Sequence, residues 1–330
     1  MKWLRNLGWP LSLIYGGVVY LRNKFYDWGW FSSKAYDIPI LCIGNLSTGG
    51  SGKTPMVEWF LSQMLPEKRV AVLSRGYRRK SKGFQLADPG STVAQLGDEP
   101  LQIARKYPHA TVAVDADRQR GIETLLRETN PELILLDDGF QHRKVLPFRS
   151  VLLTAYDELY PLEAYLPVGN LRDHRSQARR ADLVVVTKCP EALPLAERDR
   201  IRNLLDLKDG QELAFASLGY SDPTDLNGET IPMDRLRSQT LTVVTGIARP
   251  EPLLAHLRDL GLHFEHLRFR DHHRFTEAEL NRLGKRHPVL TTEKDATRLE
   301  GKLPDVWVLP VRHCFQPSDE AVMKGLLSEF

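Results

Sequence analysis

Six residues near the start of the chain have the types and spacing needed to bind the phosphates of a nucleotide. Gly49, Gly50, Ser51, Gly52, Lys53 and Thr54 follow a short apolar run and precede a helical pattern. Glycines let the backbone turn its N–H groups toward phosphate oxygens. The Lys53 ammonium would reach the β- and γ-phosphates, and the Thr54 hydroxyl would bind Mg²⁺. Ser47 replaces the first glycine of the usual G-x-x-x-x-G-K-[ST] pattern, but three glycines remain.

A phosphate loop of this kind also requires an acidic residue at the end of a nearby strand. The apolar run 133–136 ends in Asp137 and Asp138, whose carboxylates are hard oxygen ligands suited to Mg²⁺. A solvated Asp-Asp-Gly turn is the alternative, and the sequence leaves open which of the two carboxylates would touch the metal. Together with the glycine loop, this pair predicts nucleotide chemistry.

Two further groups of polar residues have less specific patterns. Asp98 and Glu99 stand directly before a helical stretch, where acidic residues commonly cap the helix. The segment 271–273 reads Asp-His-His and could form a metal cluster with His263 and His266, although a hard-cation site has little use for imidazoles. A histidine beside an aspartate could instead tune a general base.

The elements that must position these residues alternate along the chain. Apolar runs at 38–43, 70–73, 111–114, 133–136, 150–153 and 183–186 predict strands, and helical stretches such as 99–106 and 118–128 separate several of them. This alternation predicts an α/β fold of the P-loop NTPase type, with a mainly parallel sheet flanked by helices. Turn residues near position 222 suggest a boundary, so we expect a P-loop domain at 37–222 and a smaller α/β domain at 223–330, with strands at 241–245, 263–269, 288–291 and 306–311.

Composition restricts the class of protein only loosely. The chain has 330 residues, a formal net charge of +3 and three cysteines far apart in sequence, which argues against a disulfide framework. The charge is too small to indicate nucleic acid by itself. The segment 69–82 holds six basic residues and no acidic one, which suits either an anionic substrate or membrane face or a solvated loop.

The N-terminal segment 1–36 is apolar and aromatic. Residues 6–21 carry no charge and have basic residues on both sides, yet sixteen residues fall short of the ~20 that a spanning helix needs. Its tryptophans and tyrosines favour the headgroup level of a membrane. We expect an interfacial anchor on a cytoplasmic leaflet, with a helix packed in the protein core as the alternative.

Taken together, several segments resemble the tetraacyldisaccharide 4′-kinase family of lipid A assembly. They are Ser47 to Pro55, Ser-Arg-Gly-Tyr at 74–77, Gly-Asp-Glu-Pro at 97–100, Asp-Asp-Gly-Phe-Gln-His at 137–142, Pro-Val-Gly-Asn-Leu-Arg at 167–172, Asp-His-His at 271–273 and Thr-Thr-Glu-Lys-Asp-Ala at 291–296. They follow the family's order over nearly the whole chain. The family's loop also lacks the first glycine, so Ser47 fits the resemblance.

The resemblance implies phosphorylation, dependent on ATP and Mg²⁺, of the 4′-hydroxyl of a lipid-linked disaccharide 1-phosphate on the cytoplasmic face of the bacterial inner membrane. It implies that Asp98 is the catalytic base, supported by His272 from the second domain, with Lys53 in the catalytic set. It places ATP phosphates on Thr48, Gly49, Gly50, Ser51, Gly52, Lys53 and Thr54, and Mg²⁺ on Thr54, Glu99, Asp137 and Asp138. The substrate would contact Arg75, Tyr77, Arg118, Asn170 and Arg172. Neither nucleic acid nor an obligate protein partner is expected.

Two other functions remain open from the residues alone. The chain could be a soluble P-loop kinase or ligase acting on a small metabolite, in which case the N-terminal segment would be core. It could also be a nucleotide-dependent switch or chaperone that hydrolyses ATP without a phosphoryl acceptor, in which case Asp98 would not be needed for turnover.

Overall fold

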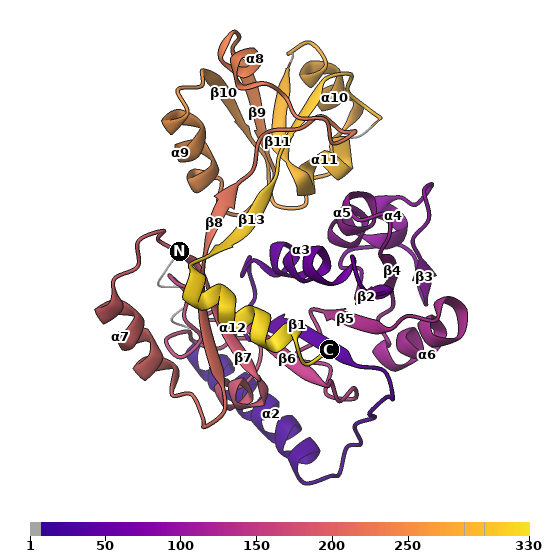
Figure 1. Ribbon diagram of the computed structural model, residues 1–330, viewed down its shortest axis with the longest axis vertical. Helices are drawn as coiled ribbons and strands as arrows, with labels where there is room; N and C mark the ends of the chain where they lie inside the picture. The colour runs from indigo at the N-terminus through magenta and orange to yellow at the C-terminus, as the bar shows by residue number, and fades with distance from the viewer. Residues whose placement is uncertain (1–7, 287, 300) are drawn as a thin grey trace.

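The structure, a computed structural model, describes residues 8–286, 288–299 and 301–330 and contains two sheets (Figure 1). The larger sheet has the strand order β13-β8-β7-β6-β1-β5-β2-β4-β3, and the smaller has the order β10-β9-β11-β12. Neighbouring strands are parallel except for β13–β8 and β3–β4 at the two edges of the large sheet. The α/β class and the mainly parallel sheet expected from the sequence are confirmed.

The strands of the large sheet are β1 (Ile40–Asn45), β2 (Val70–Ser74), β3 (Gln85–Leu86), β4 (Thr111–Val114), β5 (Leu133–Asp137), β6 (Arg149–Ala155), β7 (Leu183–Cys189), β8 (Glu212–Tyr220) and β13 (Val311–Phe315). Those of the small sheet are β9 (Leu241–Thr245), β10 (Phe264–Arg268), β11 (Val289–Thr292) and β12 (Val306–Leu309). Every residue of β1, β2 and β5 is buried, as expected for a parallel sheet covered on both faces.

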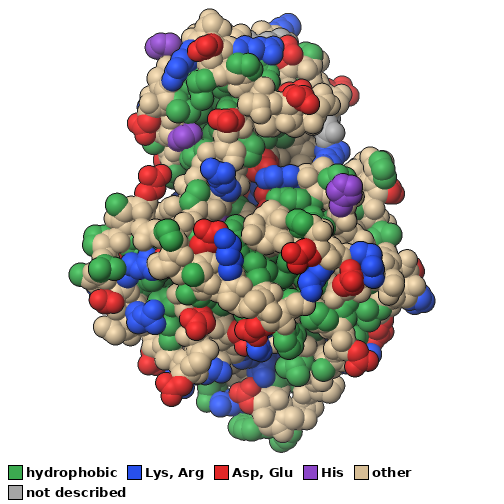
Figure 2. Space-filling view, viewed as in Figure 1, with side chains coloured by type: hydrophobic (Ala, Val, Ile, Leu, Met, Phe, Trp, Pro, Cys, Tyr) green, Lys and Arg blue, Asp and Glu red, His purple; other side chains and the backbone are tan. Residues whose placement is uncertain are grey.

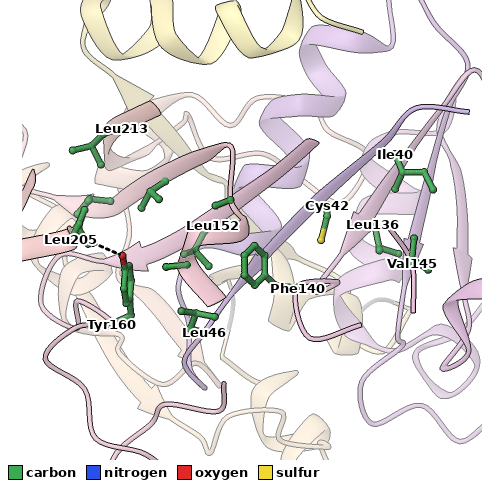
Figure 3. Close-up of a cluster of buried hydrophobic side chains, with 14 of the residues drawn as sticks. Ile40, Cys42, Leu46, Leu136, Phe140, Val145, Leu152, Tyr160, Leu205 and Leu213 are labelled. Atoms are coloured by element: carbon green, nitrogen blue, oxygen red, sulfur yellow. Dashed lines mark hydrogen bonds between the residues drawn. The ribbon is translucent and has the colours of Figure 1, made fainter. Parts of the chain in front are cut away.

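Helices cover both faces of the large sheet and make two apolar cores. One core contains Phe60 of α3 (Lys53–Met64), Ile103 of α5 (Asp98–Lys106) and Met323 of α12 (Pro317–Leu327). The other contains Ile122 of α6 (Arg118–Thr129) and Ile201 of α7 (Leu195–Leu205), and Figure 3 shows part of it, including the Tyr160 hydroxyl bonded to the Leu205 carbonyl. The remaining helical elements are α4 (Val93–Leu96), η1 (Arg175–Arg180), α8 (Met233–Arg237), α9 (Glu251–Asp259), α10 (Glu277–Leu283) and α11 (Glu293–Leu299).

The chain crosses between the two sheets twice. It leaves the large sheet after β8, near the expected boundary, and builds the small sheet up to β12. It then returns, because β13 pairs antiparallel with β8 and α12 packs on the same sheet. The single strand expected at 306–311 is divided at Pro310 into β12 of the small sheet and β13 of the large sheet, and α12 then packs on the large sheet.

Helix α2 (Trp9–Asp27) is packed with its polar side inward. Its buried residues are Ser12, Gly16 and Asn23; the Ser12 hydroxyl donates to the Tyr165 carbonyl at 2.7 Å, and the Asn23 amide donates to Asp173 Oδ1 at 2.7 Å. Its outward side carries exposed Leu11, Leu13, Ile14, Val18 and Leu21. Residues 1–7 of the N-terminal segment lie outside the described part of the chain. The helix is docked on the protein and is not a buried core helix, and its exposed apolar side chains leave the interfacial anchor a prediction. None of the described helices is both long and apolar enough to cross a membrane.

Candidate active site

The phosphate loop connects β1 to α3 and has the backbone that its glycines allow. Gly49 and Gly52 have φ of +116° and +81°, a region that residues with a Cβ rarely adopt. The Asn45 amide, at the end of β1, donates to Ser51 Oγ at 2.9 Å and ties the loop to the strand. Helix α3 begins at Lys53, so its first N–H groups point into the loop, where an anion would be stabilised.

Lys53 lies against one of the two carboxylates predicted to bind metal. Its Nζ is 3.5 Å from Asp138 Oδ1 and 3.3 Å from Asn45 Oδ1. Arg172 donates to both oxygens of Asp138, with Nη1 to Oδ2 at 3.0 Å. Burial would raise the pKa of Asp138, but the charges of Lys53 and Arg172 outweigh it and hold the pKa well below its usual range. Asp138 is therefore an ionised carboxylate already paired with two cations.

Asp137 is in a different environment from its neighbour. It is almost fully buried; Oδ2 accepts a hydrogen bond from Ser74 Oγ at 2.8 Å, and Oδ1 has no partner among the described residues. Burial, reinforced by the charges of Glu99 and Asp138, raises the pKa of Asp137 to about 6. A buried carboxylate oxygen without a partner, close to other negative charges, fits a site that takes a cation.

The described residues do not form a ready-made metal cage of three or more His, Cys, Asp or Glu side chains. The possible metal cluster of His263, His266 and the segment 271–273, which the sequence left open, is therefore not found among the described residues. Mg²⁺ is commonly held by one or two carboxylates together with the phosphates of its substrate and water, so a cage is not required.

Two side chains of the second domain, His272 and Arg298, contact Asp98, the first residue of α5. Its Oδ2 accepts a hydrogen bond from His272 Nδ1 at 2.7 Å and forms an ion pair with Arg298 Nη2 at 2.9 Å. Burial would raise the pKa of Asp98, but the His272 bond and the Arg298 charge outweigh it, so the pKa is lowered. The carboxylate is thus ionised and fixed in orientation, and its Oδ1 makes no hydrogen bond to the described residues.

His272 is itself fixed by contacts on both ring nitrogens. Lys294 Nζ is 3.1 Å from His272 Nε2 and 3.5 Å from Glu99 Oε1, which ties the ring to the second carboxylate of α5. Because an ammonium can only donate, His272 Nε2 accepts a hydrogen bond from Lys294. His272 Nδ1 therefore carries the ring proton and donates a hydrogen bond to Asp98. The φ of His272 is +60°, a strained conformation for this residue. Tyr77 lies edge-on against the ring at 5.4 Å between centroids.

The residues predicted to contact substrate fall into two groups. Tyr77 is exposed beside His272, and Arg75 is exposed with its charge acting on Arg118 and His142. Asn170 is half-buried, and its carbonyl accepts from Thr48 N at 2.7 Å. Arg118 is only 2% exposed and donates to the carbonyls of Asp115 and Asp137. Arg118 and Arg172 thus contact the aspartates predicted to bind metal, or their backbone.

Sequence reasoning missed Arg298 and Lys294 as parts of this site. Both belong to α11, which packs against α5, and Asp295 of the same helix accepts from Arg298 Nη1 at 2.9 Å and from Gly246 N at 2.8 Å. The Thr-Glu-Lys-Asp-Ala segment was the available signal, but no role was assigned to its residues. The space-filling view shows a narrower lobe above a broader one (Figure 2). The contact between α11 and α5 joins the part of the chain that carries the small sheet to the part that carries the large sheet.

Comparison with known proteins identifies the family. The sequence matches the LpxK family, described as tetraacyldisaccharide-1-P 4′-kinase, over residues 4–329. The tetraacyldisaccharide 4′-kinase of Bacteroides thetaiotaomicron is 40% identical, with 94% of this chain and 88% of that protein covered. That of Flavobacterium johnsoniae is also 40% identical, with 96% and 94% covered.

A solved structure agrees over the whole chain. The crystal structure of LpxK from Aquifex aeolicus in complex with ATP has a TM-score of 0.79 and 30% sequence identity, and 99% of each chain is covered. The chain belongs to the tetraacyldisaccharide-1-P 4′-kinase family.

Proposed function

We propose that this member of the tetraacyldisaccharide-1-P 4′-kinase family transfers the γ-phosphoryl group of ATP to the 4′-hydroxyl of a tetraacyldisaccharide 1-phosphate in the synthesis of lipid A. One observation carries the proposal beyond family membership. A carboxylate of the P-loop domain, Asp98, is bonded by His272 of the second domain, and Glu99 beside it contributes to the field at Asp137. The residue beside the proposed base thus acts on Asp137, which ends β5, and the phosphate loop follows β1, the strand paired with β5.

Asp98 is the proposed base. A sugar hydroxyl is a poor nucleophile, and a carboxylate within hydrogen-bond reach can take its proton as the bond to phosphorus forms. Oδ2 is occupied by His272 and Arg298, so Oδ1 is the oxygen that accepts the proton. His272 and Arg298 act through Asp98 by fixing its orientation.

The ATP phosphates are proposed to lie on residues 48–54, with Lys53 neutralising charge on the transferring group. Among the candidates for Mg²⁺, the partnerless Oδ1 of Asp137 is the best fit, and the charge of Glu99 acts on it, whereas Asp138 is already paired with Lys53 and Arg172. The Thr54 hydroxyl stays a further candidate. Mg²⁺ held there would offset the negative charge of the phosphates.

The acceptor is proposed to enter between the two domains. Exposed Arg75 and Tyr77 lie on the P-loop side. The part of the chain that carries the small sheet has a hollow of about 430 Å³, whose lining includes Ile247, Phe269, Arg270 and Asp271. Asp271 directly precedes His272 in the sequence. Its mixture of apolar and basic side chains suits an amphiphilic anionic substrate.

The outward apolar side of α2 supports a membrane-surface location. Exposed Leu13, Ile14 and Val18 would be costly in water but would be stabilised at the boundary between lipid headgroups and acyl chains. This location at the cytoplasmic face of the inner membrane also explains how the enzyme meets an acylated acceptor. A soluble kinase acting on a small metabolite has no need for such a face.

The direct test is to incubate the protein with γ-labelled ATP, Mg²⁺ and a tetraacyldisaccharide 1-phosphate and to look for labelled lipid. Labelled lipid is expected from the wild type, and neither Asp98→Asn nor Lys53→Met should produce it. The same variants separate the switch or chaperone alternative: if Asp98→Asn kept full turnover while Lys53→Met lost it, no acceptor hydroxyl would be involved. Folded wild-type protein that labels no lipid would overturn the proposal.

A further inference from the structure

A buried histidine on β13, the strand by which the chain returns to the large sheet, contacts the phosphate loop. His313 is 4% exposed, and its Nε2 is 2.9 Å from the carbonyl oxygen of Gly52. Because a carbonyl oxygen can only accept, Nε2 carries the proton and donates it. Burial lowers the pKa of His313 to about 4, so the ring is neutral at ordinary pH.

The contact is close enough to restrict the residue at position 52. A Cβ added to Gly52 would lie 2.9 Å from two atoms of the His313 ring, which is too short for carbon atoms. Gly52 is also the residue whose carbonyl accepts the first bond of α3, from Met56 N at 3.2 Å. The Gly52 carbonyl oxygen therefore accepts two hydrogen bonds, one from Met56 N of α3 and one from His313 Nε2 of β13.

A second side chain holds the preceding carbonyl in a similar way. Thr187 Oγ1, on β7, donates to the carbonyl oxygen of Ser51 at 2.8 Å. Carbonyl oxygens carry partial negative charge and would repel a phosphate. A loop binds phosphate when its N–H groups point inward and its carbonyls point away, so both bonds favour the binding shape before the nucleotide arrives.

The position of β13 in the chain distinguishes the His313 contact from the Thr187 contact. This strand follows β12 of the second domain after a single proline, and Val311 N donates to Glu293 Oε2 at 3.2 Å. Glu293 begins α11, the helix that carries Lys294 and Arg298. The strand that reaches Gly52 is thus bonded at its start to the helix that contacts Asp98.

We propose that His313 is a positioning residue for ATP binding, which holds the Gly52 carbonyl away from the phosphates and links the phosphate loop to the strand returning from the second domain. This inference rests on the proposed function only in taking ATP as the nucleotide. It concerns binding of ATP and not transfer to the acceptor, so the two proposals fail separately.

The test compares three replacements of His313 by their ATP affinity, measured by calorimetry without acceptor. His313→Phe keeps a ring of similar size but cannot donate, and we expect ATP affinity to fall roughly five- to tenfold, the usual effect of one lost hydrogen bond. His313→Gln places an amide N–H near the position of Nε2 and should restore affinity to within about twofold of wild type. His313→Asn is too short to reach Gly52 and should resemble the Phe variant.

A control on the same strand separates this role from general stability. Phe315→Leu removes packing against Trp59 of α3 without touching the loop, so it should lower the melting temperature and leave ATP affinity unchanged. In steady-state assays with labelled lipid, His313→Phe should raise KM for ATP and leave KM for the acceptor unchanged. Equal ATP affinity in the Gln and Asn variants, or in His313→Phe and wild type, would overturn the proposal. Wild-type protein that binds no ATP would overturn the proposed function as well.

Discussion

Replacement of Arg298 by methionine tests whether the second domain sets the state of Asp98. Arg298 is 5% exposed, forms an ion pair with Asp98 at 2.9 Å and donates a hydrogen bond to Asp295 at 2.9 Å, so both side-chain partners are charged. We take the buried ion pair to contribute about as much as a hydrogen bond to a charged group, about 1.5–3 kcal/mol, and a methionine of similar length keeps most of the packing. If the bond to Asp98 is fully formed in the transition state, kcat/KM should fall roughly ten- to a hundredfold, since about 1.4 kcal/mol is a factor of ten.

The pH profile gives a second, independent readout. Arg298 is one of the groups that lower the pKa of Asp98, so its loss should raise that pKa. As the proposed base, Asp98 must be ionised, so we expect activity to be lost as pH falls through its pKa. The acid limb of the kcat/KM profile should therefore move to higher pH in Arg298→Met.

The assay is transfer of label from ATP to lipid across a pH series, with Arg282→Met as the control. Arg282 lies exposed on α10 of the same domain, and its variant should match wild type in rate and profile. The reasoning is refuted if Arg298→Met is folded and keeps both its rate and its acid limb. A lowered melting temperature with an unchanged profile would assign Arg298 to structure alone.

Three further predictions concern the metal site, the exposed helix and the phosphate loop. Asp137→Asn should abolish transfer yet raise the free energy of unfolding of the nucleotide-free protein at pH 8 by about 1–3 kcal/mol. The pKa of Asp137 is about 6 in the folded protein, which is higher than in the unfolded chain, so the ionised carboxylate destabilises the fold at any pH above the unfolded pKa. Denaturant unfolding at pH 4 and pH 8 should therefore show the gain in stability only at pH 8. The double change Ile14→Ser and Val18→Ser should weaken sedimentation with anionic lipid vesicles at least tenfold, because each side chain contributes about 1.5 kcal/mol or more when buried in lipid, while the melting temperature stays constant. Leu195→Ser, at an exposed position on α7, should leave vesicle binding unchanged. Gly52→Ala should lower ATP affinity by tenfold or more, because φ of +81° and the nearby His313 ring both oppose a Cβ; unchanged affinity would mean that the loop tolerates another conformation.

The sequence was sufficient for those parts of the site that are local in the chain. The glycine loop and the strand ending at Asp137 each combine a motif with its supporting element within a dozen residues, so periodicity and residue type predict them directly. The pairing of Asp98 with His272 joins positions far apart, and only resemblance to a family suggested it. Arg298 lies in a segment with no distinctive chemistry of its own, and its role depends on how α11 packs against α5.

Two features of the fold depend on packing that local patterns do not determine. An apolar strand pattern says that a segment is buried but not which sheet it joins, so the run at 306–311 gave no sign that the chain returns to β8 after Pro310. The uncharged N-terminal run predicted either a membrane interface or a core helix. In the structure, its small and polar residues, such as Ser12 and Asn23, make the protein contacts because partners for their hydrogen bonds lie there.

The lowered pKa of Asp98 bears on how this carboxylate can serve as a base. A strong base would need a raised pKa, and burial alone would provide it, but His272 and Arg298 reverse the shift. Phosphoryl transfer commonly has a loose transition state in which the bond to the leaving group is largely broken before the nucleophile loses its proton. A base in such a reaction needs to be ionised and correctly oriented more than it needs to be strong. In the proposed reaction, the hydrogen bond from His272 and the charge of Arg298 meet both conditions, so we propose that the residues beyond β8 are needed for the base although the phosphate loop lies outside them.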